Sequence, residues 1–397
     1  MAGPLPNEQL KTFKEVLQNQ GPAAAAAQIN AFLEEQDNIP LHIAITGETG
    51  SGKSTFVNAF RGIDNMDEHA APTGCVETTM KVESYPHPQY PNVTLWDLPG
   101  IGTPNFPADK YLQLVGFERF DFFIIISADR FRENDVKLAL KIQTMGKKFY
   151  FVRSKIDNNM RDAKRSQKKF NAEDTLKKIR DDCIRGLENQ GIRSPQVFPV
   201  SSFDLHLYDF HLLMETLETE LPAHKRDALL LAMPNVSLRI INKKKEALQS
   251  KIKYLAAASA LGAAIPIPGL SCALDLTMLV NNAILYKNTF GLDPESLQSL
   301  ADSARVPLHD LRAEMKSSLA LEKISSEVIL NMLKVSVFHV TSIAAEEVSR
   351  FIPLFGLAAA AAISYASTYS ALTIILNMLA QDAQRVFRKA LGLDTSV

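Results

Sequence analysis

The sequence predicts an α/β domain with a mostly parallel sheet and helices on both faces, inserted between two helical segments. Three observations support this fold class. Short β-rich apolar runs alternate with longer charged, helix-like segments from residue 41 to residue 202. Apolar residues recur at helical spacing in residues 8–36, and no convincing strand follows residue 222. Strands that alternate with helices are typical of a mostly parallel sheet covered by helices.

The elements are expected in this order. Residues 8–36 form two helices, because Gly21-Pro22 interrupts their helical pattern. The five apolar runs expected to form strands are Leu41–Thr46, Val93–Trp96, Phe122–Ser127, Phe149–Val152 and Val197–Val200. The rest of the chain is helical, with breaks at Pro234, Pro266–Gly269, Gly291–Pro294 and Pro353–Gly356.

We therefore expect three segments: an N-terminal helical segment (1–38), an α/β domain (39–222) and a C-terminal helical domain (223–397). The two helical parts should pack together, since roughly 35 helical residues alone bury little surface. Residues 161–187 are dense in charge of both signs, which favours a solvated surface over a binding patch.

Composition narrows the possible functions. The chain has 397 residues and a net charge of −1, so a nucleic acid partner is not expected. Its three cysteines form no metal or disulfide pattern and fit a reducing, cytoplasmic compartment. The start, Met1-Ala2-Gly3-Pro4, contains no signal-peptide pattern, and Ala2 stands where N-myristoylation requires glycine.

Residues 47–54 match the phosphate-loop pattern at every fixed position, between an expected strand and a helix-like Thr55–Arg61. Glycines let backbone N–H groups converge on phosphate oxygens, and the helix N-terminus adds a favourable dipole. Lys53 would neutralise phosphate charge, and the Ser54 hydroxyl would bind Mg²⁺. The alternative is a glycine-rich turn that binds nothing. The residues expected at the nucleotide here are Gly47, Glu48, Thr49, Gly50, Ser51, Gly52, Lys53, Ser54 and Thr55.

Three further motifs lie at the ends of later strands. Asp97-Leu98-Pro99-Gly100 offers a carboxylate that can hold Mg²⁺ through water and a Gly100 N–H that can meet the γ-phosphate. In Ser154-Lys155-Ile156-Asp157, the Asp157 carboxylate can accept two hydrogen bonds from guanine, a donor pair that adenine lacks, and the Lys155 stem can cover the base. Ser201-Ser202 occupies the place of a loop that touches the guanine carbonyl.

No single motif decides the matter, but the four occur in the required order at carboxyl ends of expected strands, where ligands bind in such sheets. Together they predict a site for GTP or GDP with Mg²⁺.

Catalysis leaves alternatives open. Ile101 follows Gly100, where Ras-like enzymes carry the glutamine that positions water. In the loop of residues 72–79, we favour Thr79 as the switch residue that closes on Mg²⁺ and consider Glu77 for ordering the water; plain loop residues are the alternative. The chain is then either a GTPase or a nucleotide-gated scaffold with little hydrolysis.

Long stretches of this sequence resemble the interferon-inducible immunity-related GTPases. The matching stretches include 47–54, 71–80, Tyr85–Pro88, Trp96–Gly102, Asp121–Ser127, Phe149–Arg153, Leu221–Arg226 and Gly291–Asp293. The resemblance implies a dynamin-like GTPase: a Ras-like P-loop domain joined to a helical domain built from both chain ends.

The resemblance also implies function. Such proteins bind GTP or GDP with Mg²⁺, hydrolyse GTP faster when paired through their nucleotide faces, associate with intracellular membranes, and many act in cell-autonomous immunity. Lys53 is similar to the lysine-type members, and Glu77 and Arg130 would act across the dimer. Ala2 stands where a myristoylated member would carry glycine. The segments around 266–269 and 381–386 are closer to tissue-restricted members, which keeps a tissue-specific role as the alternative to an antimicrobial one.

Two long uncharged segments, 254–274 and 351–380, meet the length criterion of ~20 residues for a membrane-spanning helix. Prolines interrupt both, and alanine, which contributes little to insertion, dominates both. We favour buried helical hairpins, with inserted helices as the alternative.

Overall fold

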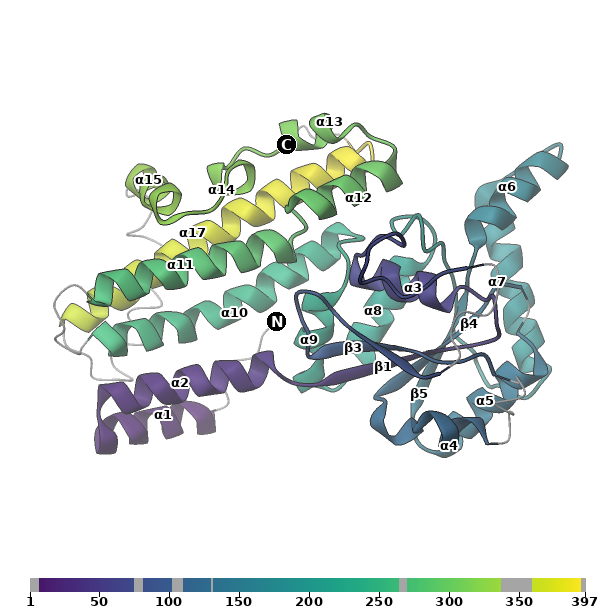
Figure 1. Cartoon of the computed structure of the whole chain (residues 1–397), viewed down its shortest axis with the longest axis horizontal. Coiled ribbons are helices and arrows are strands. Elements are labelled where there is room, and N and C mark those ends of the chain that lie inside the picture. The colour runs from purple at the N-terminus through teal and green to yellow at the C-terminus, as the bar shows by residue number, and fades with distance from the viewer. Residues whose placement is uncertain are drawn as a thin grey trace. The chain divides into compact units, whose positions relative to one another are not determined.

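The computed structural model describes residues 7–74, 81–101, 110–129, 131–263, 270–336 and 359–393. The chain divides into two units. The sheet unit comprises Ile39–Ser237, and the helical unit comprises Met1–Asn38 together with Leu238–Val397. Figure 1 shows the strands confined to the middle of the chain, with helices from the two chain ends side by side in the helical unit. This confirms the predicted fold class.

The sheet has six strands in the order β2-β3-β1-β4-β5-β6, and every neighbouring pair is parallel except β2 with β3. The strands are β1 (Leu41–Thr46), β2 (Glu83–Pro86), β3 (Val93–Asp97), β4 (Phe122–Ser127), β5 (Lys148–Arg153) and β6 (Val197–Pro199). All five expected strands are present, each within one residue of the predicted ends. The carboxyl ends of β1, β3, β4 and β5 therefore meet at one edge of the sheet.

The edge strand β2 was not predicted. Its four residues alternate between half-buried and exposed and end in Pro86, so they form no apolar run. It pairs antiparallel with β3, where Tyr85 lies opposite Leu95. An edge strand with one solvated face needs no continuous hydrophobic segment, and proline is tolerated there.

Helices cover both faces of the sheet. Phe123 and Ile125 of β4 point into a core shared with α4 (Tyr111–Val115), α5 (Glu133–Thr144) and α7 (Ala172–Glu188). The short helix η1 (Phe117–Arg119) follows α4 in the chain. Side chains alternate along a strand, so the buried Phe122 and Ile124 face the other side. On that side lie α3 (Lys53–Arg61), α8 (Phe210–Glu220) and α9 (Ala223–Ala232).

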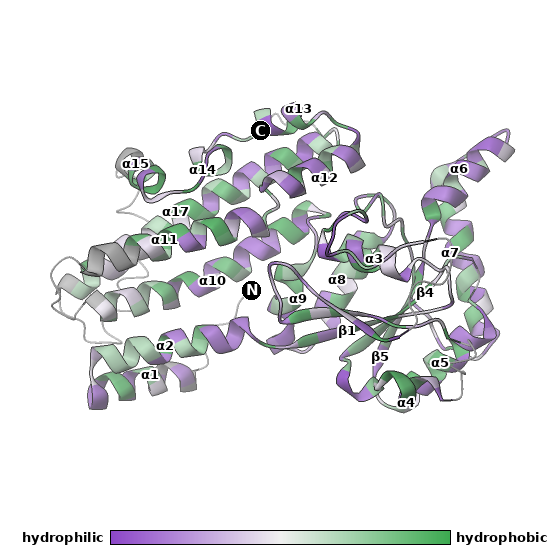
Figure 2. Cartoon of the chain, viewed as in Figure 1, coloured by the Kyte–Doolittle hydropathy of each residue, from purple (hydrophilic) through white to green (hydrophobic). Residues whose placement is uncertain are grey.

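The densely charged stretch forms α6 (Ile156–Ser166) and α7. Seven of its charged residues, Lys164, Lys168, Lys169, Lys177, Lys178, Asp181 and Asp182, are all exposed. Figure 2 shows that hydrophilic residues predominate in α6. The solvated surface is thus confirmed for these residues.

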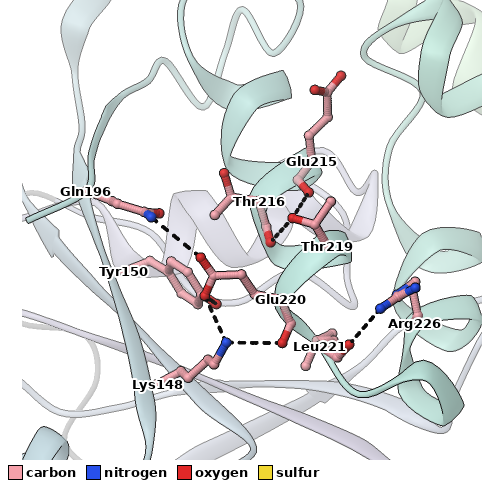
Figure 3. A network of polar contacts seen from close by, with 9 residues as sticks. All are labelled: Lys148, Tyr150, Gln196, Glu215, Thr216, Thr219, Glu220, Leu221 and Arg226. Atoms are coloured by element: carbon pink, nitrogen blue, oxygen red, sulfur yellow. Dashed lines mark hydrogen bonds and ion pairs between the residues drawn. The ribbon is translucent and has the colours of Figure 1, made fainter.

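Polar contacts fix the β5–β6 edge of the sheet to α8. Figure 3 shows Glu220, the last residue of α8, facing Lys148 and Tyr150 of β5 and Gln196, which precedes β6. Its carboxylate accepts from Lys148 Nζ at 3.0 Å, from the Tyr150 hydroxyl at 2.9 Å and from Gln196 Nε2 at 3.5 Å. Burial opposes ionisation of Glu220, but the hydrogen bonds from Lys148 and Tyr150 leave its pKa below the usual range.

The sheet unit extends further along the chain than the boundary we placed at residue 222. Lys225 Nζ of α9 forms an ion pair with Asp121 Oδ1 at 2.5 Å, and Asp121 Oδ2 accepts from His42 N at 2.8 Å. The helix α9 also contacts β1 and β3. Because α9 packs on the sheet, the unit ends at Ser237.

The helical unit joins both chain ends. Its helices are α1 (Asn7–Gln20), α2 (Pro22–Asp37), α10 (Leu238–Ala263), α11 (Leu270–Thr289), α12 (Pro294–Ala304), α13 (Leu308–Ala313), α14 (Ser318–Leu321), α15 (Ser326–Ser336) and α17 (Ala359–Ala390). The helix α10 packs along α17 and α2, and α2 packs on α1. Phe13 and Ile29 from the N-terminal end share one apolar cluster with Leu261 and Tyr365.

The described parts of the two uncharged segments lie in this packing. Ala256 and Ala260 of α10 and Leu372 of α17 are fully buried. The helix α17 also carries the buried Asp382, which accepts from Lys316 N at 2.8 Å and Ser317 N at 3.1 Å at the start of α14. By length and composition alone, residues Ala361–Ala390 could cross a membrane, and half of the qualifying stretch is buried within the protein. The proposed breaks at 266–269 and 353–356 lie outside the described residues.

Candidate nucleotide site

Glycine is required in the phosphate loop between β1 and α3. Gly47, Gly50 and Gly52 have φ angles of 139°, 77° and 94°, a region that favours glycine. A Cβ on Gly47 would lie 2.1 Å from the Ile126 carbonyl oxygen at the end of β4. Residues 47–52 thus wrap closely over the sheet edge and lead into the N-terminus of α3 at Lys53, where backbone N–H groups point outward.

Lys53 and Ser54 are buried at the start of α3. The Lys53 ammonium donates to the carbonyls of Gly47 at 3.3 Å and Glu48 at 3.0 Å, so it spans the loop that would surround phosphates. The Ser54 hydroxyl donates to Asp97 Oδ2 at 2.5 Å. Ser54 and Asp97 are 8% and 1% exposed. A hydroxyl and a carboxylate are hard oxygen ligands, so this pair fits Mg²⁺.

One polar atom in the loop also fits an anionic ligand. The Ser51 hydroxyl is buried and has no hydrogen-bond partner among the described residues. Thr49 is exposed and Thr55 is half-buried. The residues predicted to bind the nucleotide, Gly47 to Thr55, thus form one loop and the start of α3.

A tyrosine that the sequence analysis did not identify supports the Asp97–Gly100 loop. The buried Tyr111 hydroxyl donates to the Pro99 carbonyl at 2.8 Å and lies 2.8 Å from Thr46 Oγ1 at the end of β1. Burial raises the pKa of Tyr111, so the hydroxyl stays protonated. Gly100 is buried, and the Ile101 side chain is 4% exposed and belongs to the sheet core.

The Ser154–Asp157 loop meets the phosphate loop. Ser154 Oγ donates to the Ser51 carbonyl at 2.6 Å, and Lys155 Nζ donates to the Gly50 carbonyl at 2.8 Å. Lys155 has a φ of 57°, which turns the chain into α6. Asp157 lies half-buried in the first turn of that helix.

Ser201 and Ser202 follow β6 at the same edge. The Ser201 hydroxyl is fully buried and accepts from the backbone N–H groups of Phe203 at 3.2 Å and Asp204 at 3.1 Å. This loop is joined to the neighbouring one because Ile156 N donates to the Val200 carbonyl at 3.2 Å. Ser202 is half-buried. The structure therefore brings together all four predicted motifs.

Two charged residues at the start of α5, Arg132 and Asp135, lie near Glu48 of the phosphate loop. Arg132 Nη1 pairs with Glu48 Oε2 at 3.0 Å. The fully buried Asp135 accepts from Arg132 N at 3.0 Å through Oδ2. Burial, together with the charge of Glu48, raises the pKa of Asp135 to about 6, although Arg132 and Lys53 oppose the shift. The sequence analysis did not identify this group: Arg132 and Asp135 meet locally at the start of α5, but the ion pair of Arg132 with Glu48 exists only in the fold.

Three residues named from the sequence, Glu77, Thr79 and Arg130, lie outside the described residues. Their roles stay predictions.

Comparison with known proteins agrees with this geometry. A family model described as interferon-inducible GTPase (IIGP) matches residues 7–390. Interferon-inducible GTPase 5 of Rattus norvegicus is 41% identical over 389 residues, covering 98% of this chain and 83% of that protein. T-cell-specific guanine nucleotide triphosphate-binding protein 2 of Mus musculus is 42% identical over 320 residues, covering 80% and 77%.

Among solved structures, Era from Aquifex aeolicus bound to GDP and aluminium fluoride is 22% identical, covering 46% of this chain and 56% of that chain with a TM-score of 0.30. The family model spans nearly the whole chain, and the curated relatives match over most of their own length. The chain belongs to the interferon-inducible GTPase family.

Proposed function

We propose that this protein binds GTP with Mg²⁺ and hydrolyses it to GDP and phosphate. The observation that carries the proposal is the buried Ser54–Asp97 pair, 2.5 Å apart, beside a phosphate loop whose Gly47 leaves no room for a side chain. Ser54 and Asp97 would hold Mg²⁺, the latter through water, and the ion would neutralise phosphate charge.

Lys53 has a defined task in this proposal. Its ammonium would exchange the Gly47 and Glu48 carbonyls for β- and γ-phosphate oxygens, and the Gly100 N–H would meet the γ-phosphate. The buried Ser51 hydroxyl would gain a partner in the phosphates. Lys53→Ala should therefore abolish turnover, and wild-type turnover in that variant would contradict the role.

Guanine is the proposed base. Asp157 would accept from the ring N–H and the amino group, and Lys155, already fixed on the Gly50 carbonyl, would cover the base with its stem. Ser201 and Ser202 would shape the loop at the base carbonyl. Asp157→Asn should weaken GTP binding and favour xanthine nucleotides, because an amide reverses one donor and acceptor. Unchanged GTP affinity would contradict the assignment.

Assembly would complete the catalytic site. Since the Ile101 side chain lies in the sheet core, it does not orient water, and a second copy paired through the nucleotide face would supply what is missing. Glu77 would order the water and Thr79 would close on Mg²⁺. Phosphate release per molecule should rise with protein concentration; a constant rate across a dilution series would contradict assembly.

The second candidate is a nucleotide-gated scaffold, which the position of Ile101 favours. It predicts GTP binding with no phosphate release at any concentration. The same dilution series separates the two functions, because only the enzyme produces phosphate.

Membrane association and a role in interferon-linked cell-autonomous immunity complete the proposal. The family assignment supports the immune role, and the length and apolar composition of α17 support membrane contact. Contact should be peripheral, since α17 buries Leu372 and Asp382 within the helical unit. Flotation with liposomes in GTP and in GDP tests this: flotation in neither state contradicts it. Unchanged protein abundance in interferon-treated cells would contradict the immune assignment.

A further inference from the structure

Arg153 is a buried cation beneath the proposed base-binding loop. It is the last residue of β5, it directly precedes Ser154, and it is 6% exposed. Its guanidinium donates to the Ser154 carbonyl at 2.7 Å, to Asn159 Oδ1 at 3.0 Å and to the Ala128 carbonyl. The Arg153 side chain therefore joins the Ser154–Asp157 loop, called the guanine loop below, to the first turns of α6 and the end of β4.

The end of β4 supports both nucleotide loops. The Ile126 carbonyl is the atom that a side chain on Gly47 would strike. The next carbonyl, that of Ser127, accepts from Ser154 N at 2.9 Å and Ser154 Oγ at 3.2 Å. The Ala128 carbonyl accepts from Arg153. Three consecutive carbonyls thus contact the phosphate loop, the guanine loop and Arg153.

Burying a guanidinium in the protein interior costs free energy. Burial lowers the pKa of Arg153, against the attraction of Cys183 and Asp129. Its three oxygen acceptors are two backbone carbonyls and an amide, all neutral. Neutral acceptors offset little of the cost of burying the guanidinium, but its fixed donor geometry defines the position of each acceptor.

We infer that Arg153 is a positioning residue that sets the base specificity of the nucleotide site by holding Asp157 in place. In the chain, Asp157 lies between the two residues that accept hydrogen bonds from the guanidinium: Ser154, through its carbonyl, and Asn159, through its side chain. Arg153 itself is 6% exposed, and its guanidinium donates to protein oxygens that belong to or flank this loop. This inference rests on the proposed guanine site and names a residue that controls it.

The test compares fluorescent GDP with fluorescent IDP, because inosine lacks the amino group that Asp157 would bind. In Arg153→Gln we expect the GDP-over-IDP preference to fall by about tenfold, as lost polar recognition does. IDP should lose less affinity than GDP, because hypoxanthine offers Asp157 only the ring N–H and the phosphate contacts remain. Arg153→Lys should lie between the two, and Asn159→Ala should shift the preference in the same direction.

Arg161→Gln is the matched control. Arg161 is an exposed arginine on α6, the helix that carries Asp157 and Asn159, and its side chain donates to Asn158. It should keep the wild-type preference. Asn159→Ala and Arg153→Lys test the inference if Arg153→Gln does not fold. Equal loss of GDP and IDP affinity, or an unchanged preference in the variants at 153 and 159, would overturn it. A wild-type protein that binds neither nucleotide would overturn the proposed function and this inference with it, whereas wild-type binding without preference would overturn the role of Asp157.

Discussion

Replacing Gly47 with alanine should damage the nucleotide site far more than the same change at Gly50. The added Cβ at position 47 would lie 2.1 Å from the Ile126 carbonyl oxygen and 3.1 Å from its carbon. An ordinary carbon–oxygen contact is about 3.3 Å, so the loop and β4 must separate by roughly 1 Å. At Gly50 no atom lies within 4 Å of the Cβ position.

The cost at each position follows from these distances. Overpacking costs about 1–3 kcal/mol, and a non-glycine residue at the φ of 139° adds about 1–3 kcal/mol, so Gly47→Ala should lower the free energy of unfolding by about 2–6 kcal/mol. Gly50→Ala carries only the backbone term at its φ of 77°, about 1–2 kcal/mol.

The chain offers a local probe for this measurement. Its single tryptophan is Trp96 in β3, so denaturation followed by tryptophan fluorescence reports the sheet unit. Fluorescent GDP then measures binding. We expect Gly47→Ala to lose about 100-fold in affinity, since the displaced loop carries the carbonyls that hold Lys53. Equal stability losses at positions 47 and 50, or wild-type GDP affinity in Gly47→Ala, would refute this reasoning.

Three further variants test buried groups. The stability of Asp135→Asn relative to wild type should rise by about 2–3 kcal/mol between pH 4 and pH 7. The folded-state pKa of Asp135, about 6, lies above the ordinary value, so ionisation of the wild-type carboxyl weakens the fold in that window. A pH-independent difference in the free energy of urea unfolding would contradict this. Burial lowers the pKa of Lys244 to about 7, so the unfolded state binds more protons than the folded state above that pH. The stability of wild type relative to Lys244→Met should therefore rise by on the order of 3 kcal/mol from pH 7 to pH 10. Thermal melts of both proteins at pH 7 and pH 10 measure this rise, and an equal stability difference at the two pH values would contradict it. Tyr111→Phe should lower the free energy of unfolding by about 1–3 kcal/mol, because the buried Pro99 carbonyl loses its donor, and should raise the Mg²⁺ concentration needed for half-maximal GDP binding; unchanged values of both would show that the tyrosine does not hold the loop.

Local patterns in the sequence were sufficient for much of the fold. Continuous apolar runs located β1, β3, β4, β5 and β6, since a parallel strand buried on both faces has no polar side. The strand β2 was missed because it is short and half-solvated. The boundary at residue 222 missed α9, whose place in the sheet unit depends on contacts such as Lys225 with Asp121, 104 residues away in the chain.

The candidate site divides in the same way. Phosphate-loop and guanine-loop residues form short motifs whose spacing is fixed by their ligand, so they can be found without a structure. Tyr111 acts through a contact that only the fold creates, since its neighbour Thr46 is 65 residues away in the chain. Arg153 and Asp135 also bind residues close to them in the chain, Ser154 and Arg132, but these pairs form no recognised site motif. No local pattern marks a tyrosine or arginine as a support for a loop elsewhere in the chain.

The proposed activity is hydrolysis of GTP at the site formed by the Ser54–Asp97 pair and the phosphate loop. Phosphate release from GTP by the purified full chain, with excess Mg²⁺ and with Lys53→Ala alongside, tests it most directly. We predict magnesium-dependent phosphate release by the wild-type protein and none by the variant. Release that persists in the variant, or no release from wild type at any protein concentration, would contradict this proposal.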